Sequence, residues 1–180
     1  MTARACPPPT ERIRFREYQP EDVDAVAAMF DDPEARQWYP THSEAAEARR
    51  WIDWNLDNYA THGFGLWAIE DAESGAFLGD CGLTYQRVEG AVLLELGYHL
   101  QELRRGFGFA TEAARACLAY AFHTVGAELV CSICHPENVA SIAVAGTLHH
   151  AQRQFTNDAG LTMNLYWTER GPGGQATVTP

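Results

Sequence analysis

Hydrophobic residues recur at every second position in several segments of the chain, a spacing that predicts β-strands. The first such segment is RIRFREY at residues 12–18. Three more are separated by the turn sequences AESG and EG, as in an antiparallel meander, and lie at residues 64–71, 76–88 and 91–100. The pattern then predicts one strand at residues 127–134 and a closing hairpin at 151–157 and 161–169.

Between these strands, hydrophobic residues spaced three or four apart predict helices. The second of them opens on Ser43 as its N-cap and has an apolar face made of Trp51, Trp54, Leu56 and Tyr59. The four predicted helices lie at residues 20–30, 43–60, 108–126 and 138–150. This order of strands and helices indicates the mixed α/β (α+β) class.

The length and composition fit one folded domain. The chain has 180 residues, 46% of them hydrophobic, and no apolar run near the roughly 20 residues that a membrane helix needs. We expect a single domain at residues 11–170, with disordered segments at 1–10 and 171–180. The first ten residues lack the apolar stretch of a secretory signal, which favours a cytoplasmic location.

The net charge narrows the classes of partner. It is −11, and all 13 basic residues are arginine. Without a face rich in lysine and arginine, the chain is expected to bind neither nucleic acid nor a membrane, and its acidity suits a cationic partner.

The sequence CSICH at residues 131–135 has the spacing of a haem attachment site. Cys131 and Cys134 are expected at the end of a strand, where residues three apart point to opposite faces of the sheet. Both thioether bonds of an attached haem leave one local surface, so this geometry argues against haem. No second Cys or His pair stands at zinc-finger spacing from these two cysteines. We therefore predict neither haem nor a metal site.

A glycine-containing loop, LRRGFGFATEAARA, follows the strand that ends near Leu100. A strand, a short loop with Gly106 and Gly108, and a helix N-terminus is an arrangement that binds phosphate oxygens. An ordinary tight turn has the same glycines and remains an alternative. Thr111 stands where a dinucleotide-binding loop has its third glycine, and a Walker loop needs a lysine that this chain lacks.

These residues resemble the GNAT acetyltransferases. Arg105, Gly108 and Ala110 fit the Arg/Gln-x-x-Gly-x-Gly/Ala pyrophosphate loop of that family. LELGYHL is similar to the strand before the loop, and NVASIAV resembles the family's Asn-x-x-Ser segment. The element order from Glu11 to Arg170 resembles in particular the branch of ribosomal-protein-alanine N-acetyltransferases, the RimJ/RimL-like branch.

The resemblance implies a mixed, mostly antiparallel sheet of about seven strands, splayed between strands 4 and 5 and flanked by about four helices. Acetyl-CoA would lie in the splay as the co-substrate. The implied contacts of its pantetheine arm are with Gly97, Tyr98, His99, Leu100, Asn138 and Ser141. The implied contacts of its pyrophosphate are with Arg104, Arg105, Gly106, Phe107, Gly108, Phe109, Ala110 and Thr111.

Two features depart from the family pattern. Many relatives carry a tyrosine general acid seven residues after the Asn, where this chain has Ala145. That leaves Ser141 or water to protonate the departing thiolate. The sequence GTLHH at residues 146–150 replaces a Lys/Arg-Leu-Gly-Phe ending, so we expect the end of that helix to be built differently.

The fourth predicted strand also offers a base for the acceptor amine. Alternation places Glu95, Gly97 and His99 on one face of this strand. Glu95 is the first candidate for the base and His99 the second, because an amine that arrives as ammonium must lose a proton. The alternative is that Glu95 pairs with an arginine on a neighbouring strand. The aromatic side chains expected around the acceptor are Trp38, Tyr39, Trp67 and Tyr85.

The resemblance implies acetyl-CoA-dependent transfer of an acetyl group to a primary amine. The acceptor is expected to be a protein or peptide N-terminus or a small cationic amine, and the protein a monomer or homodimer. The alternative function is that of a CoA-binding sensor or assembly subunit without turnover, which keeps the phosphate loop and Asn138 but has lost the geometry of the base.

Overall fold

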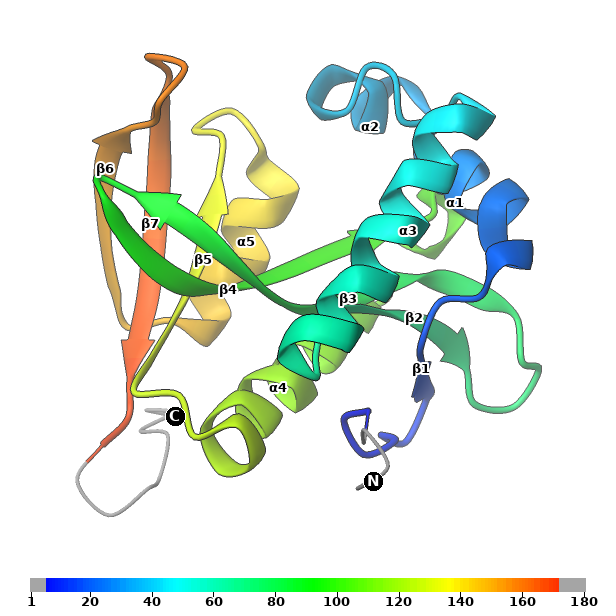
Figure 1. Cartoon of the computed structure of the whole chain (residues 1–180), viewed down its shortest axis with the longest axis horizontal. Helices are drawn as coiled ribbons and strands as arrows, with labels where there is room; N and C mark the ends of the chain where they lie inside the picture. The colour runs from blue at the N-terminus through cyan, green and yellow to red at the C-terminus, as the bar shows by residue number, and fades with distance from the viewer. Residues whose placement is uncertain (1–5, 172–180) are drawn as a thin grey trace.

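The computed structural model describes residues 6–171, which form a seven-stranded sheet with helices on both sides (Figure 1). The strand order is β1-β2-β3-β4-β5-β7-β6, and every neighbouring pair is antiparallel except β4 and β5. The predicted mixed, mostly antiparallel sheet is therefore confirmed. No helix in this part of the chain is long and apolar enough to cross a membrane.

The seven predicted strands are all present. They are β1 (Ile13–Arg16), β2 (Leu66–Asp71), β3 (Phe77–Val88), β4 (Ala91–Leu100), β5 (Leu129–Cys134), β6 (Ala151–Thr156) and β7 (Thr162–Glu169). The helices are α1 (Val23–Met29), α2 (Pro33–Trp38), α3 (Ala45–His62), α4 (Phe109–Tyr120) and α5 (Val139–Leu148). A π-helical turn at Ala121–Val125 extends α4 to Gly126, which has the left-handed conformation expected of a terminating glycine.

Strands β4 and β5 part soon after they meet. Their parallel pairing is registered at Glu95 opposite Cys131, whereas β3 and β4 pair from Gly79 opposite Leu100 to Val88 opposite Ala91. We call the part of β4 beyond Glu95, residues 96–100, the split edge. In Figure 1, β4 crosses between the β5–β7 half of the sheet with α5 and the β1–β3 half with α1 and α3. The predicted splay between the fourth and fifth strands is thus present.

Two helices differ from the sequence expectation. Helix α2 was not predicted; it begins at Pro33, and the Asp32 carboxylate accepts the backbone N–H groups of Glu34 and Ala35. Helix α3 was predicted to have Ser43 as its N-cap, but the cap residue is Glu44, so that prediction is wrong.

The buried face of α3 also differs from the predicted one. It consists of Ala48, Ile52, Asn55 and Tyr59, so of the four predicted residues Tyr59 alone belongs to it. Trp54 is 39% exposed. Trp51 and Leu56 are only partly buried against the core, so they lie beside the buried face and not on it.

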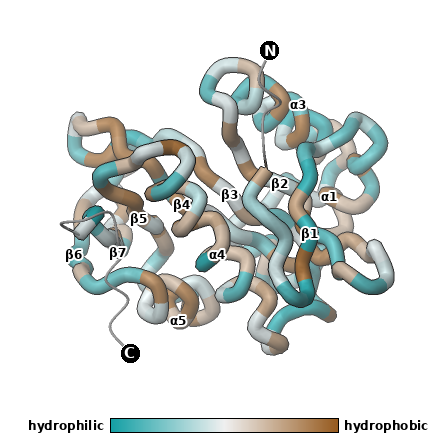
Figure 2. Tube along the Cα trace, turned by 90° about the horizontal axis from the view of Figure 1, so that it is seen from below, coloured by the Kyte–Doolittle hydropathy of each residue, from teal (hydrophilic) through white to brown (hydrophobic). Residues whose placement is uncertain are grey.

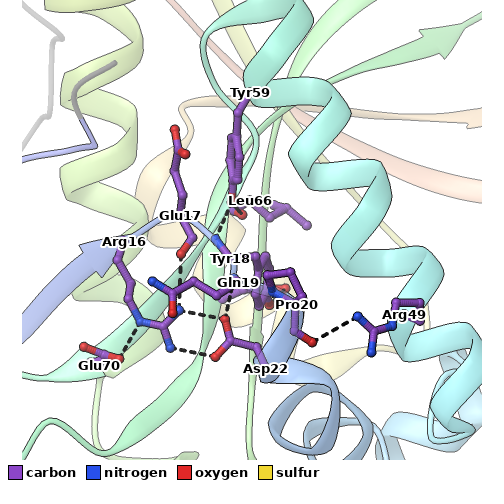
Figure 3. Close-up of polar contacts among 11 residues, drawn as sticks. Arg16, Glu17, Tyr18, Gln19, Pro20, Asp22, Arg49, Tyr59, Leu66 and Glu70 are labelled. Carbon is purple, nitrogen blue, oxygen red and sulfur yellow. Dashed lines mark hydrogen bonds and ion pairs between the residues drawn. The ribbon is translucent and has the colours of Figure 1, made fainter. Parts of the chain in front are cut away.

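Hydrogen bonds and ion pairs fasten the first strand and the first helix to the sheet (Figure 3). The Arg16 guanidinium pairs with Glu70 on β2 and with Asp22 in the turn before α1. The hydroxyl of Tyr59 on α3 donates to the Leu66 carbonyl and accepts the backbone N–H of Tyr18. These contacts fix the backbone of Tyr18, whose side chain reaches the centre of the domain.

Hydropathy along the chain fits this arrangement. Figure 2 shows α5 at the periphery and coloured mainly from white to brown, so an apolar helix lies at the edge of the molecule. Val139 in its first turn is 74% exposed. An apolar helix at an edge is suited to cover a ligand in addition to the sheet.

The segments on either side of the predicted domain, residues 1–10 and 171–180, were expected to be disordered. Residues 1–5 and 172–180 lie outside the described part of the chain. Within the described residues, Cys6 packs against the core and the Thr10 hydroxyl donates to Glu112 on α4 at 2.5 Å.

The two cysteines of the CSICH sequence face opposite sides of the sheet, as predicted. Cys131 is buried with Val88, Phe155 and Leu165. Cys134 is buried in a different cluster, with Ala145 and Tyr166. Each thiol fills an apolar site of its own.

Candidate active site

A cavity of about 370 Å³ lies along the split edge, between α2, the loop before α4 and the first turns of α5. Most of the residues predicted to hold the cofactor line it. These are Tyr98, His99, Leu100, Arg105, Gly106, Gly108, Ala110, Thr111, Asn138 and Ser141. We call it the larger cavity.

The loop before α4 exposes backbone N–H groups because of its two glycines. Gly106 and Gly108 have φ of 81° and 82°, a conformation that other residues rarely adopt. Gly108 is the N-cap of α4, and a Cβ atom added at Gly106 would meet nothing within 4 Å. The first N–H groups of α4 therefore point out of a backbone that leaves room for a bulky anion.

Arg12, at the start of β1, braces this loop. Its Nη1 donates to the Phe107 carbonyl at 3.0 Å, and its guanidinium lies 4.6 Å from the centre of the Phe109 ring. It also pairs with Glu112 in the first turn of α4 at 2.5 Å. The loop is thus fixed by contacts of Arg12, which does not line the larger cavity and which sequence reasoning did not find.

Arg105 is held by carboxylates. Its guanidinium pairs with Asp32 at 2.7 and 3.0 Å, contacts Glu34 at 3.3 Å and donates to the Leu100 carbonyl at 3.1 Å. Burial opposes ionisation of Asp32, but the hydrogen bonds from Arg105 and the α2 amides prevail and hold the pKa of Asp32 below its usual value. Arg105 therefore links the loop to α2 in addition to facing the larger cavity.

Small residues of α5 form the other wall of the larger cavity. Asn138 caps the helix, its Oδ1 accepting the backbone N–H of Ser141 at 3.0 Å. The Tyr98 hydroxyl donates to the Ser141 carbonyl at 2.9 Å and so joins α5 to the split edge. Ala145, which stands where many relatives have a tyrosine, is fully buried against the sheet.

The GTLHH sequence produces a buried polar chain behind this wall. The His149 ring lies 3.0 Å from Ser132 Oγ through Nε2 and 3.1 Å from Thr168 Oγ1 through Nδ1. Ser132 in turn donates to the Leu96 carbonyl at 2.8 Å, across the gap between β5 and β4. Burial lowers the pKa of His149 to about 4, so its imidazole is neutral at pH 7. The departure from the family pattern thus supplies a link between the two halves of the sheet.

A second, smaller cavity of about 220 Å³ lies along β4 from Glu95 to His99. Trp51, Trp54, Thr84, Gln86 and Glu95 are among its lining residues. Burial raises the pKa of Glu95 to about 7, and the Thr84 hydroxyl lies 3.4 Å from its carboxylate. None of the ion pairs within residues 6–171 involves Glu95, which argues against the alternative that it pairs with an arginine.

Between the two cavities lies a fully buried carboxylate, Asp80 on β3. It accepts hydrogen bonds from Tyr18 Oη at 2.7 Å, Trp51 Nε1 at 2.9 Å and His99 Nδ1 at 2.7 Å. The other ring nitrogen of His99, Nε2, lies 2.8 Å from the hydroxyl of Tyr39. Tyr39, Tyr98, His99 and Ser141 line both cavities, so this is where the cavities meet.

Some predicted residues lie elsewhere. Gly97 lines the smaller cavity, while Arg104, Phe107 and Phe109 line neither. Of the predicted acceptor aromatics, Trp67 is 1% exposed in the core and Tyr85 is 46% exposed beside Phe64. Sequence reasoning missed Asp80, although an acidic residue within the apolar strand AFLGDCGL was a signal that could have found it.

Metal chemistry has no evident site in the part of the chain that the structure describes. No group of three or more His, Cys, Asp or Glu side chains there is arranged to hold an ion.

Comparison with known proteins gives one consistent result. The family model described as an acetyltransferase (GNAT) domain matches residues 12–150. The chain is 36% identical over 137 residues to a Bacillus subtilis protein named YkkB, covering 76% of this chain and 80% of that protein. It is 26% identical over 167 residues to N-acetyltransferase p20 of Bacillus licheniformis, covering 87% and 91%.

Solved structures agree with the sequence relatives. An acetyltransferase from Agrobacterium tumefaciens superposes with a TM-score of 0.73 at 25% identity, covering 88% of this chain and 91% of that one. RimL, a ribosomal L7/L12 alpha-N-protein acetyltransferase in complex with coenzyme A, has a TM-score of 0.72 at 18% identity and shares the fold, covering 91% and 97%.

Proposed function

The chain belongs to the GNAT acetyltransferase family and is an acyltransferase, and we propose that it transfers the acetyl group of acetyl-CoA to a primary amine. One observation carries the proposal: two cavities lie along β4 and meet at Tyr39, Tyr98, His99 and Ser141. A donor in one cavity and an acceptor in the other would bring their reacting atoms to this point.

The larger cavity suits the acyl donor. Its loop offers N–H groups at a helix N-terminus and free space beside Gly106, which fits the two phosphates of a pyrophosphate. Acetyl-CoA would supply the thioester whose acetyl group is transferred. In the split edge, the carbonyls of Leu96 and Leu100 accept hydrogen bonds from Ser132 and Arg105. Because backbone groups of every second residue in a strand point to the same edge, the N–H of Tyr98 points to that edge too. Its N–H is our candidate to stabilise the developing oxyanion.

The smaller cavity suits the acceptor. A carboxylate and two indole rings, those of Glu95, Trp51 and Trp54, offer the charge and the aromatic faces that attract an ammonium group. Both kinds of acceptor are consistent with this lining: a protein or peptide N-terminus and a small cationic amine.

Glu95 is our candidate base. The ammonium form of the acceptor must lose a proton before its nitrogen can attack the thioester. A carboxylate with a pKa of about 7 is a stronger base than an ordinary glutamate and is still ionised above neutrality. His99 shares the face of Glu95 and is considered below.

The test is release of CoA thiol from acetyl-CoA in the presence of a panel of amines. The panel consists of peptides with free N-termini, polyamines, aminoglycosides and amino acids. We expect turnover with at least one class and a rise in the melting temperature with acetyl-CoA alone. Binding without turnover on any acceptor would favour a CoA-binding subunit, and neither binding nor turnover would overturn the proposal.

A further inference from the structure

The hydrogen-bond directions around Asp80 determine which ring nitrogen of His99 carries the proton. The indole N–H of Trp51 is a donor and cannot accept, so Asp80 Oδ2 is the acceptor there and also takes the Tyr18 hydroxyl. Asp80 Oδ1 remains for His99, which therefore carries its proton on Nδ1. In the neutral imidazole, Nε2 is then an acceptor, and the Tyr39 hydroxyl must donate to it.

The same three groups stand in a row from the core to the cavities. Asp80 is fully buried, His99 follows on the split edge, and Tyr39 lies where the two cavities meet. This order is that of a carboxylate, an imidazole and a hydroxyl in which the imidazole takes the hydroxyl proton. Tyr18, which helps to hold Asp80, is itself fastened by the contacts shown in Figure 3.

We propose that Tyr39 is the residue that moves the proton between acceptor and thiolate. His99 takes the Tyr39 proton and returns it, and Asp80 holds the His99 ring in position. This rests on the proposed function. It also explains how the chain works without a tyrosine at position 145. The hydroxyl of Tyr39, at the C-terminal end of α2, does the work of that tyrosine, whereas the Tyr98 hydroxyl is already donated to the Ser141 carbonyl.

The proton balance is complete. The ammonium first gives one proton to Glu95, which passes it to water. As the nitrogen bonds to the acetyl carbon it gives a second proton to Tyr39 Oη, while Tyr39 gives its own to His99 Nε2. The amine nitrogen forms the C–N bond, the C–S bond breaks, and the sulfur leaves with the bonding electron pair. The imidazolium then returns its proton through Tyr39 to the sulfur, which becomes the CoA thiol. The proton taken up by Glu95 is the one released to water for each acetyl group transferred.

A purely structural role is the competing explanation. The rings of Phe30, Tyr39, Trp51 and His99 pack in tilted or edge-to-face pairs with centroids 5.0 to 6.3 Å apart. Packing of this kind depends on the ring of Tyr39 and not on its hydroxyl. Tyr39→Phe therefore separates the two roles, because it keeps the ring and removes the proton.

The experiment compares Tyr39→Phe with wild-type protein on an amine that the wild type acetylates. We expect kcat to fall about 10²- to 10⁴-fold, while the acetyl-CoA-induced rise in melting temperature stays the same. Tyr166→Phe, which removes a hydroxyl from β7 outside both cavities, is the matched control and should keep wild-type turnover. His99→Gln should lose turnover to a similar extent as Tyr39→Phe.

Asp80→Asn adds a readout other than rate. Its amide would present a donor to His99 Nδ1 and move the ring proton to Nε2, which the nitrogen-15 resonances of the ring report. We expect this tautomer change together with a loss of kcat. If Asp80→Asn does not fold, the other two variants decide.

The outcomes are distinct. A wild-type protein without turnover on any amine overturns the proposed function and the relay with it. Wild-type turnover that Tyr39→Phe keeps within about threefold overturns the relay alone and leaves Glu95 or water as the path of the proton.

Discussion

Arg105 forms a two-pronged ion pair with Asp32, the residue whose carboxylate also caps α2. The loop that faces the larger cavity is thereby joined to a helix that forms another of its walls. Any anion that reaches Arg105 competes with Asp32 and Glu34 for the same guanidinium. The position of α2 and the binding of an anion at the loop are therefore coupled.

Asp32→Asn should separate the two roles of this carboxylate. Asparagine caps helices as well as aspartate does, so the substitution keeps the cap and removes the ion pair. Because the folded state lowers the pKa of Asp32, its contribution to stability is present above the ordinary carboxyl pKa and disappears as the pH falls. We expect a loss of about 1 kcal/mol in the free energy of unfolding at pH 7 and almost none at pH 3.

Denaturant titrations at the two pH values measure this difference. Glu34→Gln removes the more exposed partner of Arg105 and is the control, with an expected loss under about 0.5 kcal/mol. An equal loss for Asp32→Asn at both pH values would mean that the cap, and not the ion pair, had been damaged.

Gly108→Val should abolish the response to acetyl-CoA. Wild-type protein with ligand at about a hundred times its Kd should gain about 2.7 kcal/mol and melt roughly 5 to 10 °C higher. Valine at a φ of 82° is strained, so Gly160→Val, at a φ of 79° in the β6–β7 turn, is the matched control. Both variants should lose stability without ligand, but Gly160→Val alone should keep the ligand-induced shift. If Gly108→Val shifts like wild type, the loop does not hold the donor.

Glu95→Gln should lower turnover in a defined range of pH. An ordinary glutamate would act as a base from acidic pH upward, but a pKa of about 7 moves the rising limb of the rate to neutrality. We expect wild-type kcat to rise through pH 7 and the deficit of the variant to reach about 10²- to 10⁴-fold above it. Near the pKa of the amine, about 8 for a peptide N-terminus and about 10 for an alkyl amine, the acceptor arrives neutral and the deficit should shrink. A deficit independent of pH would show that Glu95 acts through structure.

The same substitution should stabilise the protein at alkaline pH. The folded state raises the pKa of Glu95, so the stability that the protonated side chain provides is complete below pH 4.5 and is lost as the pH rises through about 7. Glu95→Gln cannot ionise and should gain about 2 kcal/mol over wild type at pH 8.5, with no gain at pH 4.5. Melting temperatures at the two pH values are the measurement, and a gain of the same size at both would contradict the assignment.

His149 gives the opposite slope over nearly the same range. Its pKa is lowered to about 4 in the folded state, so its contribution is complete above the ordinary histidine pKa of 6.5 and is lost as the pH falls through 4. We expect His149→Gln to be less stable at pH 7 but to lose about 3 kcal/mol less than wild type between pH 7 and pH 4. Wild type should show a flatter profile than either variant, because the slopes of Glu95 and His149 oppose each other. A variant as sensitive to acid as wild type would contradict the burial of a neutral imidazole.

The order of the elements and the position of the phosphate loop could be predicted because both are local signals. Alternation predicted the bounds of β4 at Ala91 and Leu100, and the spacing of Gly106 and Gly108 predicted the loop geometry. The sequence could not show that Glu95 forms no ion pair with an arginine, since this depends on which side chains the sheet register brings together.

The centre of the site shows the same limit more strongly. Asp80 gains its partners from position 18 in the segment after β1, position 51 on α3 and position 99 on β4, so no stretch of sequence contains the arrangement. Helix α2 was missed because its six residues are too few to show a helical period. The aspartate at its N-cap, Asp32, is also a common residue in loops, so it did not by itself indicate a helix.

We expect the narrow junction of β4 and β5 to divide the domain into two cooperative units. Among the described residues, one registered pair and the Ser132 to Leu96 hydrogen bond join the strands, and the Tyr98 to Ser141 hydrogen bond adds a link through α5. In contrast, β5, β7 and β6 are paired with each other over almost their full length. The half made of β5–β7 and α5 can therefore open without breaking the β2–β4 meander, and its amides should exchange with solvent through that sub-global opening. A molecule lying along the split edge touches both halves, so its binding would raise the free energy of this opening and fuse two folding units into one.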